Sequence, residues 1–185
     1  MLFSLQGICQ ISNSIIDQYI IVLDIQEEYT TNSMSLSASQ ELMESVNYVI
    51  QKADPNKVIY IKSFHKILNV SFSKPVIFVS IDSSDIWNLD SRMEIVNTNI
   101  ISKEESDVFK VKELTDILEK NNARDIIVIG LMAEKCVSKS LLGGMELGYN
   151  MFTIPKAIAG KTENSKDRAI KKLMKAGVKQ INIVE

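Results

Sequence analysis

The sequence has few of the features that mark nucleic-acid-binding proteins or membrane proteins. Its 185 residues hold 21 Lys and Arg against 23 Asp and Glu, a net charge of -2, and no basic stripe follows the chain. The longest apolar runs, such as Tyr19–Leu23 and Ile126–Leu131, are far shorter than the roughly 20 residues that cross a bilayer. We therefore expect a soluble protein with no nucleic-acid partner and no membrane partner.

Cysteine is also scarce, with only Cys9 and Cys136 in the chain. Residues 1–11 are mildly apolar, but they carry no early Lys or Arg and no convincing cleavage site of small residues, so they do not predict a secretory signal. Two cysteines and no export signal favour a reducing cytoplasm with both thiols free.

A single histidine, His65, limits what metal chemistry the chain can carry. One His cannot supply a transition-metal ligand set, and the nearby Asp82, Asp85 and Asp90 are interpreted as solvated loop residues. The sequence therefore predicts no bound metal and no cofactor.

The fold class follows from the alternation of short runs rich in Val and Ile with longer segments of helical period. This pattern predicts an α/β fold with a doubly wound, mostly parallel sheet of about six strands and helices on both faces. The length suits one domain over residues 1–185, with residues 1–18 as an N-terminal arm. The expected strands are Tyr19–Ile25, Val58–Ile61, Glu94–Ile101, Asp125–Gly130, Asn150–Ile154 and Val178–Val184, with Pro75–Ile81 as a further strand-like run.

Helices are expected between these strands. After the first strand, Ser37 and Gln40 have the spacing of a capping box before a run with one apolar face. Gly148 and Gly177 stand where two later helices should end. Residues 63–92 are the least regular stretch and are interpreted as a variable lid. The later helices are expected at Val111–Lys120, Cys136–Leu147 and Ser165–Ala176.

Three polar or reactive residues stand at the ends of predicted strands, where open parallel sheets bind their ligands. Asp24 interrupts an apolar strand, Lys103 closes another, and Cys136 opens a helix after a third. A helix N-terminus favours a thiolate, and a buried carboxylate needs a cation or a proton donor. Their joint placement predicts a nucleophile, a base and a cation at one edge of the sheet.

Each of these residues has a simpler interpretation when taken alone. A lone cysteine is more often a small apolar residue of the core, and a lysine at a strand end is more often solvated. A dyad of Cys136 with His65 is an alternative, but His65 lies in the irregular segment without a recognisable setting. Without His, a carboxylate must take the thiol proton and a cation must stabilise the thiolate.

At this point the sequence resembles the isochorismatase-like cysteine hydrolase family, which includes nicotinamidases and N-carbamoylsarcosine amidases. The resemblance covers nearly everything from Tyr19 to the end. The matching segments are Val22–Gln26 with Tyr29, Ser102–Lys103 with Ser106 and Phe109, and Ile127–Val137 followed by Leu147–Tyr149.

The resemblance implies a Rossmann-like sheet and a catalytic triad of Asp24, Lys103 and Cys136. It also implies a cis peptide between Leu131 and Met132, which orients backbone N–H groups near Met132, with that of Cys136, as an oxyanion hole. Tyr29, Trp87 and Phe109 are candidates for the wall of the substrate pocket, although aromatic residues in such a fold are equally often core.

The chain departs from the family at several positions. It lacks the Asp-x-His motif and the further histidines of the metal-binding nicotinamidase branch, which argues against nicotinamide as substrate. Glu134 stands where the family often has Asp, and Ala133 where it often has Thr. Residues 1–18 have no clear family counterpart and are interpreted as a dimer arm, so a homodimer or larger homo-oligomer is expected.

The function expected from these residues is hydrolysis of a small amide or ureide C–N bond through a thioester on Cys136. The main alternative is a catalytically inactive protein that keeps the fold as a binding or scaffold module. A thiol redox protein is disfavoured because no second cysteine lies near Cys136. Relatives without the cysteine cleave the vinyl ether of isochorismate, and the cysteine here favours acyl chemistry.

Overall fold

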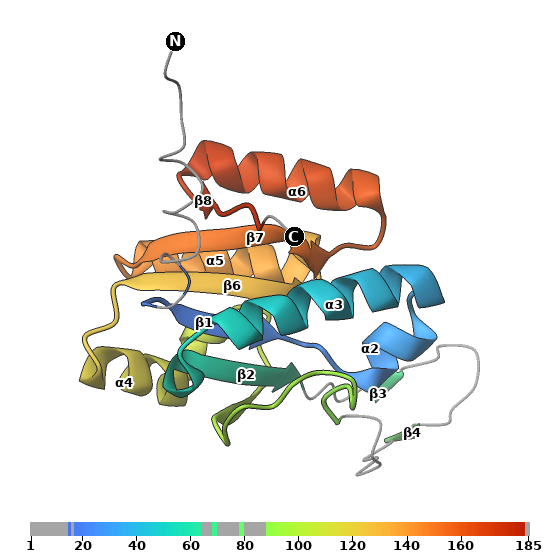
Figure 1. Ribbon diagram of the computed structural model, residues 1–185, viewed down its shortest axis with the longest axis horizontal. Coiled ribbons are helices and arrows are strands. Elements are labelled where there is room, and N and C mark those ends of the chain that lie inside the picture. Colours follow the sequence, from blue (N-terminus) through green and yellow to red (C-terminus); the bar gives the residue numbers. More distant parts are fainter. Residues whose placement is uncertain (1–14, 16, 64–67, 70–77, 80–87, 184–185) are drawn as a thin grey trace.

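A six-stranded parallel sheet, ordered β5-β2-β1-β6-β7-β8, forms the centre of the protein (Figure 1). The computed structural model describes residues 15, 17–63, 68–69, 78–79 and 88–183. The chain starts in the middle of the sheet, runs outward through β2 to β5, and then returns to β6 on the other side of β1. This confirms the doubly wound fold. The strands are β1 (Tyr19–Leu23), β2 (Val58–Ser63), β5 (Ile100–Lys103), β6 (Asp125–Leu131), β7 (Asn150–Ala159) and β8 (Lys179–Gln180).

Helices cover both faces of this sheet. The short α2 (Glu27–Asn32) leads into α3 (Leu36–Lys52), which packs on one face, while α4 (Lys112–Lys120), α5 (Ser138–Glu146) and α6 (Glu163–Ala176) pack on the other. The two short strands β3 (Leu68–Asn69) and β4 (Phe78–Val79) pair with each other and not with the main sheet. Among the described residues, no helix is long and apolar enough to cross a membrane.

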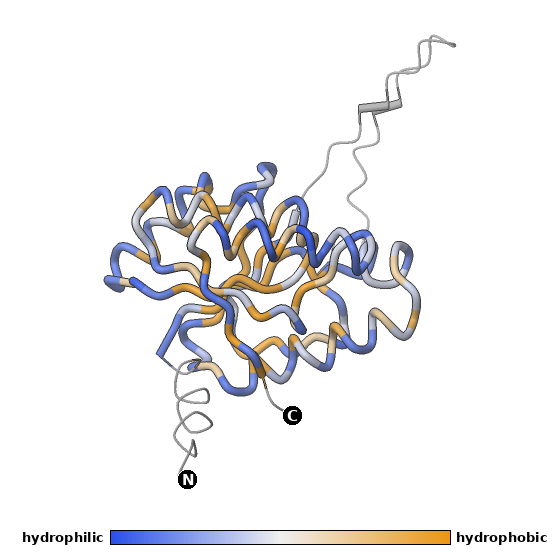
Figure 2. The backbone as a smooth tube through the Cα atoms, turned by 90° about the horizontal axis from the view of Figure 1, so that it is seen from above, coloured by the Kyte–Doolittle hydropathy of each residue, from blue (hydrophilic) through white to orange (hydrophobic). Residues whose placement is uncertain are grey.

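Two hydrophobic cores result, because successive residues of a strand point to opposite faces of the sheet. On β1, Ile20 and Val22 join the core under α3, whereas Ile21 and Leu23 join the core under α4, α5 and α6. All four side chains are at most 1% exposed. The tube view shows apolar residues concentrated along the strands between the helices (Figure 2). A strand buried on both faces has to be continuously apolar, as the sequence of β1 is.

The strand predictions hold for the centre of the sheet and fail at its margins. The strand expected at Glu94–Ile101 begins only at Ile100, because Asn97 accepts the N–H of Asn99 at 2.7 Å and forms a turn there. Of the strand expected at Val178–Val184, only Lys179–Gln180 pairs with β7. Apart from Phe78–Val79, the strand-like run Pro75–Ile81 lies outside the described residues.

Two details of the helix predictions are also corrected. The N-cap of α3 is Ser35, whose side chain accepts the N–H of Ala38, and Ser37 lies inside the helix. The helix α2 was not predicted. The two predicted helix ends are confirmed, because Gly148 and Gly177 have φ angles of 87° and 108°, in the left-handed region that favours glycine.

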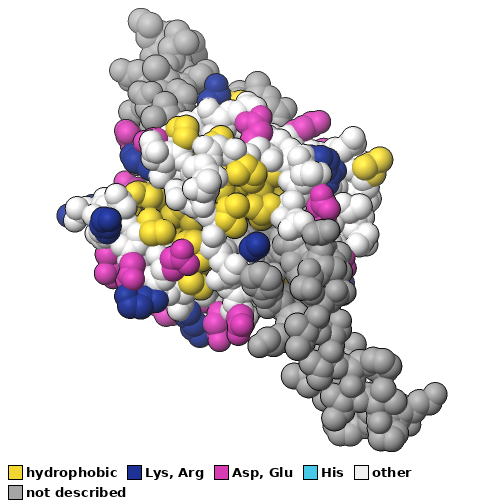
Figure 3. All heavy atoms as spheres, turned by 90° about the horizontal axis from the view of Figure 1, so that it is seen from below, with side chains coloured by type: hydrophobic (Ala, Val, Ile, Leu, Met, Phe, Trp, Pro, Cys, Tyr) yellow, Lys and Arg dark blue, Asp and Glu magenta, His cyan; other side chains and the backbone are white. Residues whose placement is uncertain are grey.

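The β5 edge of the sheet and the neighbouring loop expose some apolar surface. Ile100 on β5 is 40% exposed, and Ile95 before it is 47% exposed. Seen from below the view of Figure 1, apolar side chains gather on one face of the molecule between charged ones (Figure 3). The predicted dimer arm lies outside the described residues except for Ile15, Asp17 and Gln18, and self-association stays a prediction.

Gly130 provides a test of how tightly β1 and β6 are packed at the end of the sheet. A Cβ atom at Gly130 would lie 2.1 Å from the backbone oxygen of Leu23, and the φ angle of Gly130 is 110°. Gly130→Ala should therefore lower the free energy of unfolding by about 3 to 4 kcal/mol, from overpacking and from backbone strain together. Denaturant unfolding measures this loss.

The matched control is Gly148→Ala, where φ is 87° but a Cβ atom would have no neighbour within 4 Å. This variant should lose only the conformational contribution of about 1 kcal/mol. Equal losses in the two variants would contradict the close approach of β6 to Leu23.

Candidate active site

The carboxyl ends of β1, β2, β5 and β6 meet at one edge of the sheet, beside the point where the strand order reverses. Asp24 follows β1 with a φ angle of 56°, a left-handed conformation that is uncommon for a residue other than glycine. Its N–H still donates to the carbonyl of Ile61 on β2, at 2.9 Å. The backbone of Asp24 therefore stays attached to the sheet while turning out of the strand.

Lys103, the last residue of β5, occupies the centre of this edge. Its Nζ atom lies 2.9 Å from Oδ2 of Asp24, 2.8 Å from Oγ of Ser63 and 3.3 Å from Sγ of Cys136. The lysine is 2% exposed and Asp24 is 4% exposed. Removing two such charges from water costs several kcal/mol per ion unless each finds good partners, and this geometry provides them. The structure thus brings the three residues predicted at the strand ends together.

Ser63 is a member of this cluster that the sequence did not reveal. Its hydroxyl donates to Oδ1 of Asp24 at 2.7 Å and accepts from Nζ of Lys103, and the residue is 2% exposed. Ser63 ends β2, which runs two residues beyond the predicted end at Ile61. Asp24 and Lys103 were predicted because polar residues at the ends of parallel strands lie where ligands bind. A predicted strand that extended to Ser63 would have added this residue for the same reason.

The side chain of Gln26 holds the backbone of Ser63 in place through two hydrogen bonds. Its Oε1 atom accepts the backbone N–H of Ser63 at 2.8 Å, and its Nε2 atom donates to the carbonyl of Ser63 at 3.3 Å. The glutamine side chain is fully buried. Gln26 therefore takes the place of a β1 partner for Ser63, which pairs with Lys103 of β5 on its other side, and holds the serine hydroxyl between Asp24 and Lys103.

Cys136 lies in a π-helical turn, Ala133–Val137, and not in the α-helix predicted from Cys136 onward, since α5 begins at Ser138. The peptide bond before the turn, Leu131–Met132, is cis. The carbonyl of Met132 accepts the N–H groups of Lys135, at 2.9 Å, and of Val137, at 3.3 Å. The turn thereby presents the partly exposed thiol at the edge of the sheet.

Burial and charge have opposing effects on this thiol. Burial raises the pKa of Cys136, the Asp24 carboxylate raises it further, and Lys103 lowers it, with a net pKa above the ordinary value. The cation is thus the neighbour that favours the thiolate, and the carboxylate is the neighbour that favours a protonated sulfur. These are the relations expected of a thiol beside its base and its stabilising cation.

Glu134, two residues before Cys136, ties the π-helical turn to the start of α6. Its Oε1 atom accepts the backbone N–H of Lys161 at 2.9 Å and the hydroxyl of Ser165 at 3.3 Å. A Cβ atom at Gly160 would lie 2.7 Å from the other carboxylate oxygen, so the backbone of Gly160 covers the glutamate closely. Oε1 of Glu134, which stands where the family often has Asp, is therefore bound to the loop before α6, while Oε2 is buried and accepts no hydrogen bond from the described residues.

A cavity of about 600 Å³ lies beside the segment that leads to Cys136, with Tyr29, Leu131 and Met132 among its lining residues. Burial raises the pKa of the Tyr29 hydroxyl, and Asp24 and Cys136 raise it further, so the tyrosine lies within electrostatic range of both. Phe109, also expected in the pocket wall, instead packs in the core with its ring centroid 5.5 Å from that of Tyr149. Trp87, the third aromatic candidate, lies outside the described residues.

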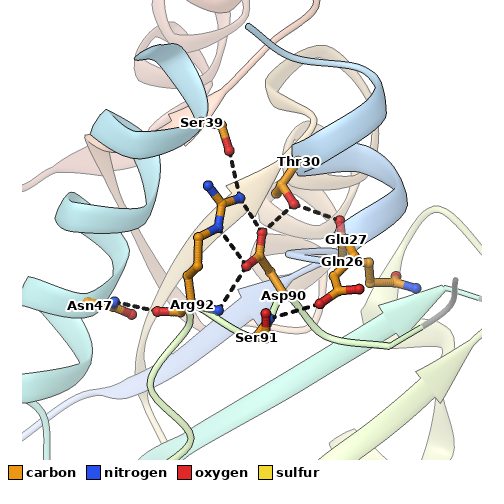
Figure 4. Close-up of polar contacts among 8 residues, drawn as sticks. All are labelled: Gln26, Glu27, Thr30, Ser39, Asn47, Asp90, Ser91 and Arg92. Atoms are coloured by element: carbon orange, nitrogen blue, oxygen red, sulfur yellow. Dashed lines mark hydrogen bonds and ion pairs between the residues drawn. The ribbon is translucent and has the colours of Figure 1, made fainter. Parts of the chain in front are cut away.

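A second buried polar cluster joins Asp90 and Arg92 to residues of α2 and α3 (Figure 4). Asp90 is 2% exposed and binds Arg92 through both carboxylate oxygens, at 2.5 and 2.9 Å. Thr30 donates to the same carboxylate, and Arg92 donates to Ser39. The interpretation of Asp90 as a solvated residue is therefore wrong, because a charged arginine and a hydroxyl replace the water.

This cluster is bonded directly to the chain segment that follows β1. The N–H of Asp90 donates to the carbonyl of Ile25, the residue after Asp24, and Gln26 forms an isolated β-bridge with Leu89. Oγ1 of Thr30 also lies 3.0 Å from the carbonyl oxygen of Gln26. Asp90 thus holds the segment that carries both Asp24 and Gln26. Asp82 and Asp85, the other predicted loop carboxylates, lie outside the described residues.

No group of three or more His, Cys, Asp and Glu side chains within the described ranges is arranged to hold a metal ion. The carboxylates at the site are used by Lys103 and Arg92, and His65 lies outside the described residues. The described residues therefore do not fit a metal centre.

Comparison with known proteins identifies relatives over nearly the whole chain. A sequence model of the family described as "Isochorismatase domain" matches residues 18–184. A secreted isochorismatase effector from Verticillium dahliae is 20% identical over 178 residues, which are 96% of this chain and 90% of that protein. Its name contains the word secreted, and the cytoplasmic location of this chain stays a prediction.

Solved structures share the fold at low sequence identity. The pyrazinamidase of Pyrococcus horikoshii, in complex with zinc, superposes with a TM-score of 0.72 at 19% identity, covering 90% of this chain and 99% of that one. An isochorismatase family protein from Desulfovibrio vulgaris superposes with a TM-score of 0.73 at 12% identity, covering 89% of this chain and 93% of that one. At such identities the likeness establishes the fold.

The pKa of Asp90 predicts how the stability of the protein depends on pH. Although burial raises this pKa, the hydrogen bonds from Arg92 and Thr30 outweigh burial and lower it. A lowered folded-state pKa stabilises the protein above the unfolded pKa of about 4, and this contribution is lost as the pH falls further. Asp90→Asn should therefore lower the free energy of unfolding by about 2 kcal/mol at pH 7, a value discounted for solvent screening because the side chain of Arg92 is 38% exposed.

The difference between wild type and Asp90→Asn should begin to narrow below about pH 4, where the carboxylate of the unfolded chain takes up a proton, and should be lost once the native carboxylate, whose pKa is lower, is protonated as well. Denaturant unfolding at several pH values measures it. Asp116→Asn is the control, because it removes an exposed i,i+4 pair with Lys112 and should change stability by at most about 0.5 kcal/mol. An Asp90→Asn effect as small as the control, or independent of pH, would contradict the buried ion pair.

Proposed function

The chain belongs to the isochorismatase family, whose sequence model matches residues 18–184, and on this premise we propose that it hydrolyses a small amide or ureide C–N bond with Cys136 as nucleophile. One observation carries the proposal. A single buried cation, Nζ of Lys103, lies 2.9 Å from the carboxylate of Asp24 and 3.3 Å from the sulfur of Cys136. A nucleophile and a base that both contact one cation are what acyl transfer by a thiol requires when no histidine is at hand.

In the first step Asp24 takes the proton of the Cys136 thiol, and Lys103 stabilises the thiolate. The thiolate forms a bond to the carbonyl carbon of the substrate, and the carbonyl electron pair moves onto the oxygen. We assign the stabilisation of this oxyanion to backbone N–H groups at Met132 and Cys136.

In the second step the tetrahedral intermediate collapses. The C–N bond breaks, and the proton held by Asp24 passes to the leaving nitrogen, which departs as ammonia or an amine. Asp24, again a carboxylate, then takes a proton from water as the water oxygen attacks the thioester. The C–S bond then breaks, the acid is released, and the proton on Asp24 passes to the sulfur and restores the thiol. Neither an oxidant nor a cofactor is needed.

Ser63 and Gln26 act in this scheme as positioning residues. Ser63 donates to Oδ1 of Asp24, which leaves Oδ2 toward Lys103. Gln26 holds Ser63 through its backbone. A fixed carboxylate keeps the proton-transfer distance short in every turnover.

The second candidate function is that of an inactive binding or scaffold protein with the same fold. The raised pKa of Cys136 favours it, because a protonated thiol is the resting state of the site at neutral pH. The replacement of frequent family residues by Ala133 and Glu134 in the nucleophile turn also favours it. The two candidates differ in the reactivity of Cys136 and in turnover.

The pH profile of Cys136 alkylation tests the arrangement without a known substrate. Lys103 lowers and Asp24 raises the pKa of the thiol, so Lys103→Ala should move the alkylation midpoint to higher pH and Asp24→Asn should move it to lower pH. Both variants are made in protein that carries Cys9→Ser. Alkylation of Cys136 is stopped at fixed times at several pH values, and mass spectrometry of the products gives the midpoint of each pH profile.

The two expected shifts of the alkylation midpoint have opposite signs, which distinguishes them from an effect of unfolding. Both variants weaken the same buried pair, so unfolding would shift both midpoints in the same direction. Circular dichroism verifies that each variant is folded. Lys139→Ala, an exposed lysine on α5 three residues from Cys136, is the control and should leave the midpoint unchanged. Shifts of the same sign, or none, would contradict the catalytic grouping.

Ammonia release from a panel of small amides, ureides and hydroxamates tests turnover itself. Wild type should release ammonia from at least one compound, and Cys136→Ala should reduce that rate by at least about 1,000-fold while still binding it, because only the nucleophilic sulfur is removed. Lys139→Ala should keep the wild-type rate. Unchanged turnover in Cys136→Ala would refute the role of the sulfur, and no release from any compound would favour the scaffold candidate.

A further inference from the structure

A second cavity lies between α5 and α6 and has a volume of about 410 Å³. It shares no lining residue with the cavity beside Leu131 and Met132, so within the described part of the chain the two are separate. A volume of this size falls in the range of sites that bind small molecules. We call this second cavity the α5–α6 groove.

Two rows of residues form the walls of the α5–α6 groove. One wall consists of Glu134, Ser138 and Leu142, which recur every four residues from the nucleophile turn into α5. The other wall is one face of α6, from Ser165 to Ala176. Both walls start at the same place, because Oγ of Ser165 lies 3.3 Å from Oε1 of Glu134. The groove therefore runs from the back of the nucleophile turn along the two helices.

Much of the groove is apolar, and one of its leucines is partly exposed. Ala169 and Leu173 of α6 are buried, whereas Leu142 of α5 is 40% exposed. An apolar group that covered Leu142 would remove its surface from water, which is favourable. The lining thus fits a ligand with an apolar body.

Two cations border the groove without acidic partners. Arg168 and Lys172 lie one turn apart on α6, a spacing at which like charges repel. Within the described ranges neither side chain forms an ion pair, and Nε of Arg168 donates to the carbonyl of Asn164 at 3.1 Å. An anion between the two cations would relieve their repulsion and gain charge-assisted hydrogen bonds. The groove is therefore complementary to an anion.

The groove has different charges at its two ends. The carboxylate of Glu134 lies at the end beside the nucleophile turn, where its Oε1 accepts the backbone N–H of Lys161. Lys172 stands two helical turns beyond Ser165, which is about 10 Å along the axis of α6. An anionic group is therefore attracted to the end with Arg168 and Lys172, away from the glutamate.

The groove also contacts the residues that hold the nucleophile turn in shape. Glu134 and Ser138, which line it, stand two residues before and two residues after Cys136. The hydroxyl of Ser138 donates to the carbonyl of Ala133 at the start of the turn. A ligand in the groove therefore touches the turn without touching Asp24 or Lys103, neither of which lines the groove.

We propose that the α5–α6 groove binds a small amphipathic anion, an acidic group on an apolar body, and that this ligand is an effector of Cys136 and not its substrate. The acidic group is held by Arg168 and Lys172, and the apolar body covers Leu142. A bound ligand stabilises the turn in its present form, in which the thiol is only partly exposed, so reagents reach the sulfur more slowly. The inference rests on the proposed hydrolase function only for the role of Cys136.

Two fluorescent dyes with similar aromatic bodies test the binding site. Anilinonaphthalene sulfonate carries an acidic group, and N-phenylnaphthylamine is neutral. Arg168→Gln combined with Lys172→Gln should weaken binding of the sulfonate by about tenfold and leave binding of the neutral dye within about twofold, because only the sulfonate uses the two cations. Both side chains are exposed, so the variant should fold. Fluorescence titration near physiological salt measures the dissociation constants.

Two control variants show where the sulfonate dye binds. Lys171→Gln combined with Lys175→Gln removes the same charge from α6 at residues that do not line the groove, and should change the affinity by less than about twofold. Lys161→Gln removes a lysine of the other cavity and should also leave the affinity unchanged. Equal weakening in the two double variants, or weakening only in Lys161→Gln, overturns the assignment of the groove.

The effect on the nucleophile is measured with iodoacetamide in protein that carries Cys9→Ser, in which Cys136 is the only thiol. Saturating sulfonate dye should slow alkylation of Cys136 by at least about threefold. At the same dye concentration, the Arg168→Gln and Lys172→Gln variant should show less slowing, and the Lys171→Gln and Lys175→Gln variant should show the full effect.

The outcomes of these experiments separate the groove from the hydrolase function. Dye binding that depends on Arg168 and Lys172 but leaves alkylation unchanged or faster overturns the effector role. Failure of the free protein to react with iodoacetamide counts against the hydrolase function, while the dye titrations still decide whether the groove binds an anion. Charge-dependent binding together with slower alkylation supports the proposal.

Discussion

The buried contact between Lys103 and Asp24 is the interaction on which the rest of the structure depends. An ammonium and a carboxylate that are both less than a twentieth exposed are tolerated only when nearly every polar atom is satisfied. Ser63 supplies one hydrogen bond to each, and Gln26 supplies the backbone hydrogen bonds that hold Ser63. Removing one member would leave a neighbour buried without its partner, so these residues form a unit rather than a set of separate contributions.

Sheet topology makes this unit possible. Asp24, Ser63 and Lys103 close three adjacent parallel strands, so their side chains meet at one edge although as many as 79 residues separate them. The left-handed backbone of Asp24 turns the chain at the sheet edge, and Gly130 lets β6 approach β1 at the same level. The strained backbone of Asp24 and the absent side chain of Gly130 are local features. Both fit a geometry that the order of the strands in the sheet determines.

Much of this arrangement could be predicted from the sequence, for a definite physical reason. Buried parallel strands are continuously apolar, so Asp24 and Lys103 stood out as interruptions, and the direction of parallel strands placed them together. Ser63 was missed because a strand end is uncertain by a few residues and a serine interrupts an apolar run only weakly. Asp90 was misjudged because its burial depends on Thr30 and Arg92, and Phe109 because an aromatic side chain fits a core as well as a pocket. Pairings between distant side chains leave no periodic signal in the sequence.

The raised pKa of Cys136 and its proposed role as nucleophile are compatible, because the relevant proton transfer stays inside the site. When the proton passes from the sulfur to Asp24, negative charge moves from the carboxylate to the thiolate and the net charge of the group is unchanged. Lys103 lies within 3.3 Å of both acceptors of that charge, so it stabilises the site before and after the transfer. A pKa describes exchange of the proton with water, which creates a new charge in a poorly solvated place. Transfer of the proton from the sulfur to Asp24 creates no new charge. Burial therefore opposes this transfer far less than it opposes loss of the thiol proton to solvent.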